Sequence, residues 1–444
     1  MDFDTKNKGL ASLPDDFLHS MEKIDGFDVS SYLCSFSEEA KKGFHVNPFC
    51  IPSSLSADDL RGWLTEAFCS SCASHFDISL SPLREISNAF IYETPAQQSG
   101  IGYHALHHAG VVYAQDPAAL CPVGAFSLSD HFPAEASLKI LDLCAAPGGK
   151  TSQLAGMTDP HKDLLIANEI NPSRNRILVG NMERMGYKNI VITRSEPSRL
   201  AERYPGYFDL ILVDAPCSGE GMFRKYPESI DQWSQDNVKL CIERQKDILK
   251  QAHRMLKDGG ILIYSTCTYE TGENEDRVRD LCDNYGYHTL ALPSALKDYE
   301  SPILQGCARL YPHTADGEGQ FVAYLKKDGT YHPDDLTSLK TVSGVDLKTN
   351  NAKKGKKSSV LPEDLIAFWE NNIDKEHQYL LARIKRFGDR FFLWPEALNR
   401  LPAENITMSG VLVGEIERNG FVPAHQFFSA YGKYFKEQIE LSPG

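Results

Sequence analysis

The sequence predicts an α/β protein built on a mostly parallel sheet with helices on both faces. Between residues 138 and 325, short apolar runs of strand length alternate with longer segments of helical periodicity. Glycine and proline residues separate many of these segments, as expected where strands and helices end. Strands that alternate with helices form parallel sheets, because each helix carries the chain back to the start of the next strand.

The individual elements follow from this alternation. Pro172 suits the first turn of a helix, where its fixed φ and missing N–H cost nothing, and Gly186 can end that helix. Gly259 and Gly260 end another long periodic segment. Helices are predicted at residues 150–155, 172–185, 236–257 and 274–282, and strands at residues 138–143, 164–168, 189–193, 208–213, 261–264 and 320–325.

The regions on either side of this alternation have a different texture. Ser56 is a predicted N-cap of a helix that runs to about Phe68. Residues 342–360 contain five lysines among Ser, Gly and Asn, which is typical of a flexible basic linker. Residues 410–416 and 418–421 again contain the apolar residues typical of a folded domain, and they predict two strands around an Asn-Gly turn. We therefore expect domains at residues 1–100, 101–330 and 361–444, with a linker at residues 331–360.

Length and composition are those of an ordinary globular protein. The chain has 444 residues, 42% of them hydrophobic and 24% charged, which suggests about three domains. No apolar run is long enough to span a bilayer, and the N-terminus lacks the features of a signal peptide. The eleven cysteines show no framework spacing, as expected for free thiols in a reducing compartment. These features predict a cytoplasmic protein with no membrane partner.

Charge and metal-ligand patterns narrow the function further. The net charge of −14 disfavours a nucleic-acid-binding protein, so any such role must depend on local basic stretches. Cys69 and Cys72 have zinc-ligand spacing, but no second pair follows, and helix cysteines are the simpler interpretation. His104 and His108 would share a helix face, but no neighbouring acid or cysteine completes a site. No metal site is predicted.

The first segment that indicates chemistry runs from Asp142 to Lys150. It follows a predicted strand, and ligands of doubly wound sheets bind at the carboxyl ends of strands. Its small residues let a ligand approach the backbone closely. Cys144 stands where a phosphate-binding loop needs a glycine, and the dinucleotide pattern G-x-G-x-x-G is also absent. The segment therefore favours a nucleoside-type ligand without a pyrophosphate.

Acidic residues follow the next strands. Glu169 ends one strand, where a carboxylate can bind both hydroxyls of a ribose, and Glu196 follows the next, where an acid can reach adenine. Asp214 ends a third. Each acid alone could equally be a solvated loop residue. Acids at three successive strand ends favour a binding site.

Two cysteines lie just past predicted strands. Cys217 belongs to the segment Asp214–Gly221, and Cys267 belongs to Ser265–Tyr269. A single cysteine at a strand end is usually a small apolar filler. Two of them at adjacent strand ends, beside the expected ligand, indicate thiol chemistry.

These segments together resemble the Nol1/Nop2/Sun family of RNA cytosine-5 methyltransferases. The resemblance rests on Asp142–Thr151, Asp214–Gly221 and Ser265–Glu275, and it covers roughly residues 88–327. It extends upstream to Tyr113–Ala118 and downstream to Arg309–His313 with Gly317–Gly319. The region after the linker is similar to the C-terminal domain of the bacterial RsmF branch, which acts on 16S ribosomal RNA. That C-terminal domain is related to PUA RNA-binding modules.

The resemblance implies a fold and an activity. The fold would be the Rossmann-like fold of S-adenosylmethionine-dependent methyltransferases, with a mostly parallel seven-stranded sheet. A small N-terminal α+β domain would assist RNA binding, and a C-terminal α+β PUA-like domain would bind RNA. The protein would be a monomeric enzyme that uses S-adenosylmethionine to form 5-methylcytosine in ribosomal RNA, within the small ribosomal subunit, during ribosome biogenesis.

The resemblance also implies roles for single residues. Cys267 would be the nucleophile, Cys217 would assist product release, and Asp214 would orient the base, with Lys150 nearby. Two positions depart from the family pattern: Glu196 stands where the family often has Asp, and His45 replaces an arginine. The implied cofactor-binding residues are Cys144, Ala145, Ala146, Pro147, Gly148, Gly149, Lys150, Glu169, Arg174, Glu196 and Asp214.

The implied reaction suits these groups. A thiolate that adds to carbon 6 of cytosine makes carbon 5 nucleophilic, so that it can take a methyl group from a sulfonium. A free thiol has a pKa of about 8.5, and the sulfonium with Lys150 or Lys225 would favour its thiolate. The base must leave any stack to enter the pocket. Expected RNA contacts are Lys225, Lys353, Lys354, Lys356, Lys357, Arg383, Lys385, Arg386 and Arg390, although the last four could simply be a solvated helix face.

Two alternatives stay open. The same fold could act on transfer RNA, with the same chemistry, or on a protein. A protein of another class, which binds RNA during ribosome assembly, could retain the fold with a vestigial cofactor pocket. The presence of both Cys217 and Cys267 argues against the second alternative, because binding alone needs neither thiol.

Overall fold

The computed structural model describes most of the chain. The described residues are 13–52, 55–70, 76–84, 86–95, 98, 100–332, 361–395, 397, 405–418 and 420–437. Cys72 and nearly all of the predicted linker lie outside them, including Lys348, Lys353, Lys354, Lys356 and Lys357.

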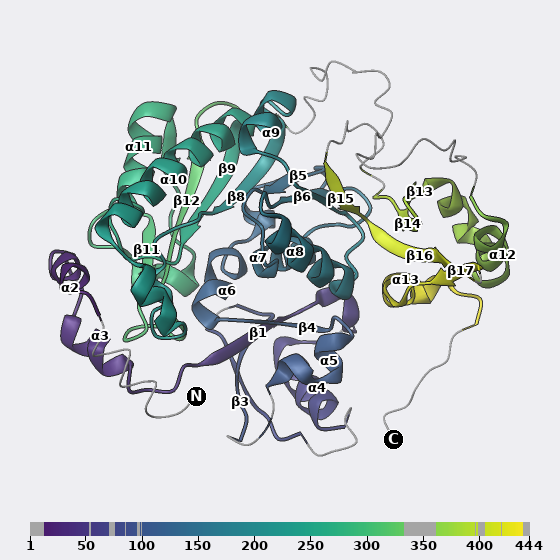
Figure 1. The fold of residues 1–444 in the computed structure, drawn as a ribbon, viewed down its shortest axis with the longest axis horizontal. Coiled ribbons are helices and arrows are strands. Elements are labelled where there is room, and N and C mark those ends of the chain that lie inside the picture. Colours follow the sequence, from purple (N-terminus) through teal and green to yellow (C-terminus); the bar gives the residue numbers. More distant parts are fainter. Residues whose placement is uncertain are drawn as a thin grey trace.

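A nine-stranded sheet forms the centre of the molecule (Figure 1). Five neighbouring strands are parallel, and the remaining four pair antiparallel to them or to each other. The parallel strands lie in the order β9 (Leu256–Thr266), β8 (Phe208–Asp214), β5 (Lys139–Asp142), β6 (Leu164–Asn168) and β7 (Ile190–Thr193). The antiparallel strands are β10 (Tyr287–Thr289), β11 (Cys307–Leu310) and β12 (Gln320–Lys327) on the β9 side, and β15 (Ile406–Ser409) beside β7.

This architecture confirms the predicted α/β class with a mostly parallel core. The six predicted strands correspond to β5, β6, β7, β8, β9 and β12. In the described part of the chain the sheet has nine strands, where the family resemblance implied seven. One strand beyond the predicted series, β15, comes from the region after the linker and therefore ties that region to the central sheet.

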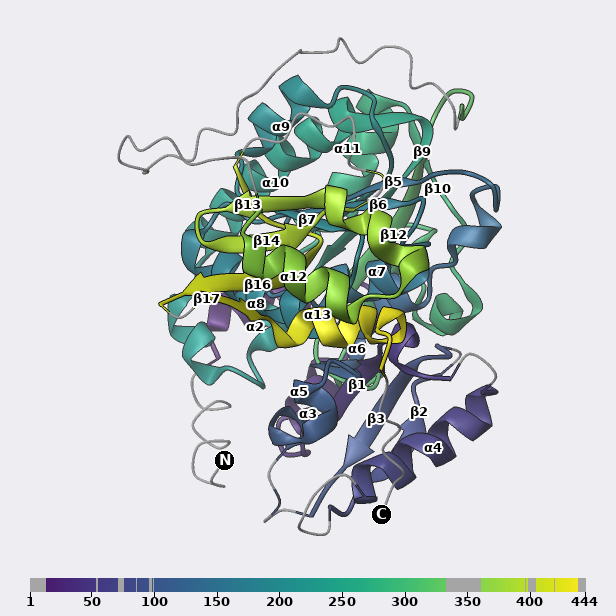
Figure 2. The same ribbon diagram turned by 90° about the vertical axis from the view of Figure 1, so that its right-hand side faces the viewer.

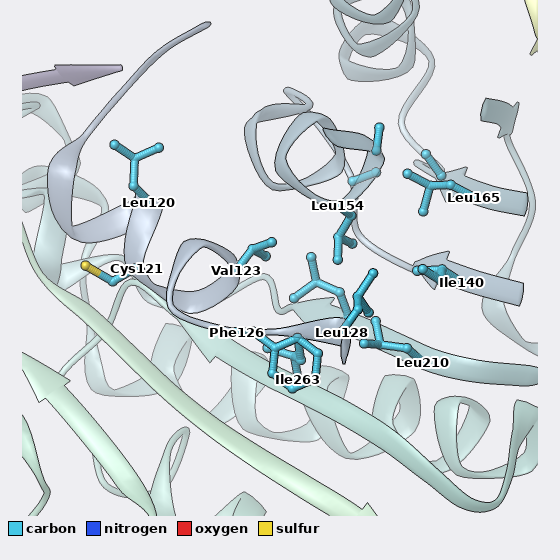
Figure 3. Close-up of a cluster of buried hydrophobic side chains, with 14 of the residues drawn as sticks. Leu120, Cys121, Val123, Phe126, Leu128, Ile140, Leu154, Leu165, Leu210 and Ile263 are labelled. Carbon is cyan, nitrogen blue, oxygen red and sulfur yellow. The ribbon is translucent and has the colours of Figure 1, made fainter. Parts of the chain in front are cut away.

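Helices cover both faces of the sheet because alternate strand residues are apolar on both sides. Leu210 and Leu212 of β8 belong to one core cluster, while Ile211 and Val213 belong to the other. Figure 3 shows part of the first cluster, in which Val123 lies between Leu120 and Leu154. Helices α6 (Pro117–Gly124), α7 (Gly149–Met157) and α8 (Pro172–Met185) contribute to the first cluster, and α9 (Pro197–Arg203), α10 (Gln235–Met255) and α11 (Glu275–Tyr285) to the second.

The ends of α8 confirm the predicted signals. Pro172 is the first residue of the helix, and the Asn171 side chain accepts hydrogen bonds from the next two backbone N–H groups. Gly186 ends the helix with a φ of +69°, in the left-handed region that glycine adopts without strain. Local sequence signals therefore fix this helix, which contributes Arg174 to the site.

The N-terminal region forms a separate antiparallel sheet. Its strands lie in the order β2 (Ser79–Pro82), β3 (Ala89–Glu93), β1 (Lys42–Val46) and β4 (Val112–Gln115), so this sheet extends past residue 100, where we had placed the domain boundary. Helix α4 (Ala57–Ser70) packs on it, and the Ser56 hydroxyl accepts a hydrogen bond from the Asp59 N–H as predicted for an N-cap. The shorter helices are α2 (Asp15–Met21), α3 (Val29–Ser35) and α5 (Ala105–His108).

The region after the linker forms a third sheet (Figure 2). The predicted pair of strands is present, with Glu417 opposite Gly420. Besides the pairing of β15 with β7, this region contacts the central domain at the Lys188 ammonium, which lies 4.1 Å from the centre of the Tyr431 ring. Its elements are α12 (Glu363–Asn372), β13 (Ile384–Phe387), β14 (Arg390–Leu393), β16 (Val411–Glu417), β17 (Gly420–Pro423) and α13 (His425–Tyr431). Within the described ranges, no helix is long and apolar enough to cross a membrane.

Candidate active site

The two predicted cysteines meet at the carboxyl ends of β8 and β9. These strands are parallel neighbours, with Asp214 opposite Ser265. Cys217 and Cys267 follow in the two adjacent loops, and their sulfurs lie 3.2 Å apart. Both residues are half-buried. The hydrogen bond with Cys267, together with burial, raises the pKa of the Cys217 thiol well above its usual value, so Cys217 stays protonated at neutral pH.

Asp214 stands at the same edge, between a lysine and a hydroxyl. Its Oδ2 atom accepts a hydrogen bond of 2.9 Å from the Lys150 ammonium, and its Oδ1 atom accepts one of 2.7 Å from the Ser265 hydroxyl. The lysine is almost buried, whereas about a third of the Asp214 side chain is exposed. A carboxylate fixed at both oxygens, but still accessible, can hydrogen-bond a ligand in one defined orientation. Sequence reasoning missed Ser265 as a partner of this group.

The loop between β5 and α7, residues 144–150, is the predicted cofactor cradle, and it turns tightly against α8. Gly148 has a φ of +113°, and a Cβ atom there would lie 2.9 Å from the methyl group of Met182, so only glycine fits. Asp142 is buried beneath the loop, and its Oδ2 atom accepts a 2.6 Å hydrogen bond from Thr151. Burial raises the pKa of Asp142 to about 7. Its other oxygen has no hydrogen-bond partner among the described residues, as expected beside a polar ligand.

Glu169 and Arg174 are linked to this loop. Glu169 is buried at the end of β6, where one carboxylate oxygen accepts a 2.8 Å hydrogen bond from the Asn171 N–H. The other oxygen lies 3.3 Å from the Arg174 guanidinium, which also donates to the Ala146 carbonyl. Arg174 therefore joins the acid to the cradle. Glu196 lies one strand further out and is exposed at the start of α9.

Two glycines hold the cysteine loops against the segment before β12. The Gly221 N–H donates to the Cys267 carbonyl, and the Gly319 N–H donates to the Gly221 carbonyl, both at 2.9 Å. A Cβ atom on Gly221 would lie 2.7 Å from the Cα atom of Gly319. This close approach explains why the motifs Asp214–Gly221 and Gly317–Gly319 both contain glycine.

Sequence reasoning also missed four polar residues behind the cysteines. Ser218 and Thr268 directly follow Cys217 and Cys267, and their hydroxyls lie 2.9 Å apart. The buried carboxylates of Glu220 and Glu273 flank them. Glu220 and Thr268 stand inside the motifs that were singled out, but sequence alone gives no sign that their side chains point inward.

The predicted RNA-binding residues are spread over the molecule. Lys225 is half-buried, with its ammonium 5.8 Å from the centre of the Tyr226 ring. Lys385, Arg386 and Arg390 lie in the hairpin of β13 and β14, so the alternative of a solvated helix face is wrong for them. Arg383 donates to the carbonyls of Trp394 and Pro395, Arg386 pairs with Asp389, Arg390 pairs with Glu183, and Lys385 is exposed.

His45 and His104 both have structural roles. The His45 ring is buried 2.9 Å from the Ser152 hydroxyl, and burial lowers its pKa to about 3, so it is neutral inside the protein. His104 caps α5 through the Leu106 N–H and contacts the Phe68 carbonyl at 3.1 Å. Among the described residues, no group of three or more His, Cys, Asp and Glu side chains could hold a metal ion.

Comparisons with known proteins agree with this site. The family described as 16S rRNA methyltransferase RsmB/F matches residues 132–326. Ribosomal RNA small subunit methyltransferase F of Vibrio parahaemolyticus is 29% identical over 430 residues, which cover 94% of this chain and 83% of that protein. The protein of the same name from Serratia proteamaculans is 34% identical over 328 residues, which cover 72% of this chain and 64% of that protein.

Two solved structures from Pyrococcus horikoshii share the fold. A methyltransferase homolog protein superimposes with a TM-score of 0.58 at 24% identity, over 74% of this chain and all of that chain. NSun6 with SFG superimposes with a TM-score of 0.55 at 19% identity, over 72% of this chain and all of that chain.

The fold and the site together define an S-adenosylmethionine-dependent methyltransferase. The nucleoside cradle at Gly148 and the acid at Glu169 fit that cofactor. Within this class, residues 132–326 match the family described as 16S rRNA methyltransferase RsmB/F, and the relatives of this chain carry the name of its F branch.

Proposed function

We propose that this protein methylates carbon 5 of a cytosine in 16S ribosomal RNA through a covalent bond between Cys267 and carbon 6. The observation that carries the proposal is the contact between two thiols, 3.2 Å apart, at the edge of the sheet where Asp214 and the nucleoside cradle also lie. The match of residues 132–326 to the RsmB/F family and relatives named for small-subunit ribosomal RNA support an RNA substrate.

The residues divide the work as follows. S-adenosylmethionine supplies the methyl group when it is bound, in the cradle of residues 144–150 with Glu169, Arg174 and Glu196 at its rim. The Cys267 thiolate adds to carbon 6, and the electron pair of the ring double bond makes carbon 5 nucleophilic. Asp214, held by Lys150 and Ser265, accepts a hydrogen bond from the amino group of the base and so orients the ring for attack by Cys267.

Release of the product needs two further events. The proton on carbon 5 must leave, and the bond between Cys267 and carbon 6 must break. Cys217 is a protonated thiol in contact with the Cys267 sulfur, so it can pass its proton to that sulfur as the bond breaks. The Cys217 thiolate left behind takes the proton from carbon 5, whose electron pair restores the ring double bond. Both cysteines are then thiols, and the Cys267 thiol must release one proton to solvent, equivalent to the proton that left carbon 5, before the next turnover.

The test is transfer of a labelled methyl group by the full-length protein. We expect label from S-adenosylmethionine to enter 16S ribosomal RNA, either free or in the small subunit, and to be recovered as 5-methylcytidine after nuclease digestion. Bisulfite sequencing of ribosomal and transfer RNA from a deletion strain then locates the nucleotide. Label in transfer RNA alone would support the first alternative. Failure to bind S-adenosylmethionine in calorimetry would leave only a ribosome-assembly role with a vestigial pocket.

A further inference from the structure

A line of four buried side chains lies behind the two cysteines. It runs Glu273, Ser218, Thr268, Glu220, and we call it the carboxyl–hydroxyl chain. Both glutamates are completely buried, and the two hydroxyl residues are almost so. Ser218 and Thr268 are the residues directly after Cys217 and Cys267. The carboxyl–hydroxyl chain takes no part in the reaction steps above. Burying a carboxyl group costs free energy unless hydrogen bonds satisfy it, so the partners of these two groups indicate what they do.

The two carboxyl groups have different partners. Each oxygen of Glu220 accepts from an N–H group: one from the Trp233 ring at 2.7 Å, the other from the Tyr269 backbone at 2.8 Å. The second oxygen also accepts from the Thr268 hydroxyl. A carboxylate faced by N–H donors at both oxygens is satisfied in its ionised form.

Glu273 faces N–H donors at one oxygen only. Its Oε2 atom accepts from the Ser218 N–H at 3.2 Å and from the Gln245 amide at 2.7 Å. Its Oε1 atom faces only hydroxyls, those of Ser218 in close contact and of Thr268 at 3.5 Å. Burial raises the pKa of Glu273 to about 7, the direction expected for an acid that keeps its proton.

Counting protons decides how the chain is arranged. Five contacts join the four side chains. The three shortest run from Glu273 to Ser218, from Ser218 to Thr268 and from Thr268 to Glu220, and two longer ones join Ser218 to Glu220 at 3.1 Å and Thr268 to Glu273 at 3.5 Å. The two hydroxyls supply only two protons, so the three shortest contacts need one further proton from a carboxyl group. Placing it on Oε1 of Glu273 lets each group donate to the next, and the line ends at the ionised Glu220.

We propose that Glu220 and Glu273 are positioning residues, which share one proton through Ser218 and Thr268 and thereby hold the thiols of Cys217 and Cys267 in contact. Glu273 also acts on the other side of Cys217, because the Gln245 amide that it holds donates to the Pro216 carbonyl at 3.1 Å. Each cysteine therefore stands beside an anchored residue on a buried polar line. The consequence for catalysis rests on the proposed function, but the effect on thiol geometry does not.

The distance between the thiols can be tested by oxidation. Diamide takes two electrons and two protons from the thiols of Cys217 and Cys267, which form a disulfide while diamide is reduced to its hydrazine. The rate of this step, followed by mass spectrometry of unreduced peptides from the full-length protein, reports how often the sulfurs meet. We expect Glu220→Gln and Glu273→Ala to slow it on the order of tenfold or more, because each removes hydrogen bonds of the chain.

Glu273→Gln is the informative rescue variant. Its amide NH₂ can donate to Ser218 in place of the carboxyl proton, while its carbonyl accepts from the Ser218 N–H and Gln245. We therefore expect its disulfide to form at nearly the natural rate. Glu220→Gln cannot be rescued in this way. Whichever way its amide is turned, the NH₂ group faces an N–H donor, either the Trp233 ring or the Tyr269 backbone. If Glu273→Gln is as slow as Glu273→Ala, Glu273 is ionised and the shared proton is ruled out.

Asp209→Asn is the matched control. Asp209 is a completely buried carboxylate near the other end of β8, and it accepts from the Lys139 N–H and the Lys257 ammonium, both at 2.6 Å. We expect Asp209→Asn to lower the melting temperature of the protein without slowing formation of the disulfide between Cys217 and Cys267. Unchanged rates in both Glu220→Gln and Glu273→Ala would overturn the positioning role. In an active enzyme, Glu220→Gln should lower kcat on the order of 100-fold with little change in KM, as a displaced nucleophile does.

Discussion

The sulfurs of Cys217 and Cys267 lie 3.2 Å apart although fifty residues separate them in the sequence. The register of β8 and β9, with Asp214 opposite Ser265, brings their loops to one edge of the sheet. The Gly221 N–H then fastens one loop to the carbonyl of Cys267 in the other. The reaction that we propose depends on this contact, and the following experiments test the groups around it.

Asp214→Asn should reduce turnover far more than cofactor binding. The amide keeps the size of the side chain but loses the charge that strengthens its hydrogen bond from the base, and losing one such contact typically costs on the order of 100-fold in rate. Single-turnover kinetics and calorimetry with S-adenosylmethionine measure the two effects separately. A variant that binds the cofactor poorly but turns over normally would reassign Asp214 to the cofactor.

Lys150→Met should have an effect in the same direction, because Asp214 then keeps only the hydrogen bond from Ser265. Lys188→Met is a matched control: Lys188 lies against Tyr431 on α13, and its loss should leave turnover unchanged. Equal effects of the two lysine variants would show that the loss at Lys150 is not specific.

Asp142→Asn should make folding stability less dependent on pH. In the folded protein burial raises the pKa of Asp142 from 3.8 to about 7, with Thr151 and Lys150 opposing the shift and Asp214 adding to it. Between these two values the folded state binds more protons than the unfolded state, so stability falls as pH rises, by at most ~1.4 kcal/mol per pH unit. Above pH 7 this cost is complete.

The asparagine can still accept the hydrogen bond from Thr151 but carries no charge. We therefore expect Asp142→Asn to gain stability relative to the natural protein as the pH rises from about 4 to about 7, as measured by urea unfolding at several pH values. A constant difference between the two proteins across this range would mean that the Asp142 carboxyl group is already ionised at low pH.

Removal of the region after residue 327 should destabilise the remaining domain. Strand β15 pairs with β7, and Phe392, Met408 and Leu412 lie in the core cluster that also contains Met182 of α8. A fragment that ends at Lys327 therefore uncovers a sheet edge and apolar side chains. We expect its melting temperature to drop on the order of 5 °C or more. Full-length protein that is cleaved only within residues 342–360 should keep its melting temperature, because both parts remain docked.

Affinity for RNA is a separate readout of the same fragment. If residues 361–444 form an RNA-binding domain, the fragment should bind ribosomal RNA more weakly but keep its affinity for S-adenosylmethionine. Unchanged methylation of RNA by the fragment would remove the RNA-anchoring role from this region.

Elements defined by neighbouring residues could be predicted from the sequence, whereas elements defined by distant partners could not. Local signals predicted α8 correctly, because Pro172, Asn171 and Gly186 define its ends within a few residues. The site motifs were also visible, because each follows an apolar strand and contains residues with few structural uses. In contrast, β15 pairs with a strand more than two hundred residues away, and its short pattern gives no sign of that partner.

The carboxyl–hydroxyl chain was missed for a related reason. Glu273, Ser218 and Gln245 lie in three separate segments of the sequence, and only the fold brings them together. In the sequence, a glutamate just before a helix is expected to be solvated. His45 is a second example: the sequence marked it only as a departure from a family arginine, and its burial by β1 beside Ser152 was not predicted. Burial of polar side chains depends on tertiary packing, which residue patterns do not encode locally.

The last prediction separates the roles of the two cysteines. With Cys267→Ala, no thiolate adds to carbon 6, so carbon 5 is not activated and no covalent complex with RNA can form. With Cys217→Ala, addition and methyl transfer can proceed, but no thiol stands 3.2 Å from the Cys267 sulfur to supply its proton. Elimination is then slow, and the enzyme stays bonded to its methylated RNA. A denaturing gel should show a slower, RNase-sensitive band for Cys217→Ala with S-adenosylmethionine.

Cys267→Ala and the double variant are the controls, and neither should show that band. The Cys241→Ala variant is a matched control for loss of a thiol, because Cys241 is buried on α10 and takes no part in the proposed steps. A shifted band for Cys267→Ala would exchange the two roles and make Cys217 the nucleophile. Full activity in the double variant would exclude covalent catalysis by either cysteine, because carbon 5 of cytosine would then be methylated without a thiol to activate it.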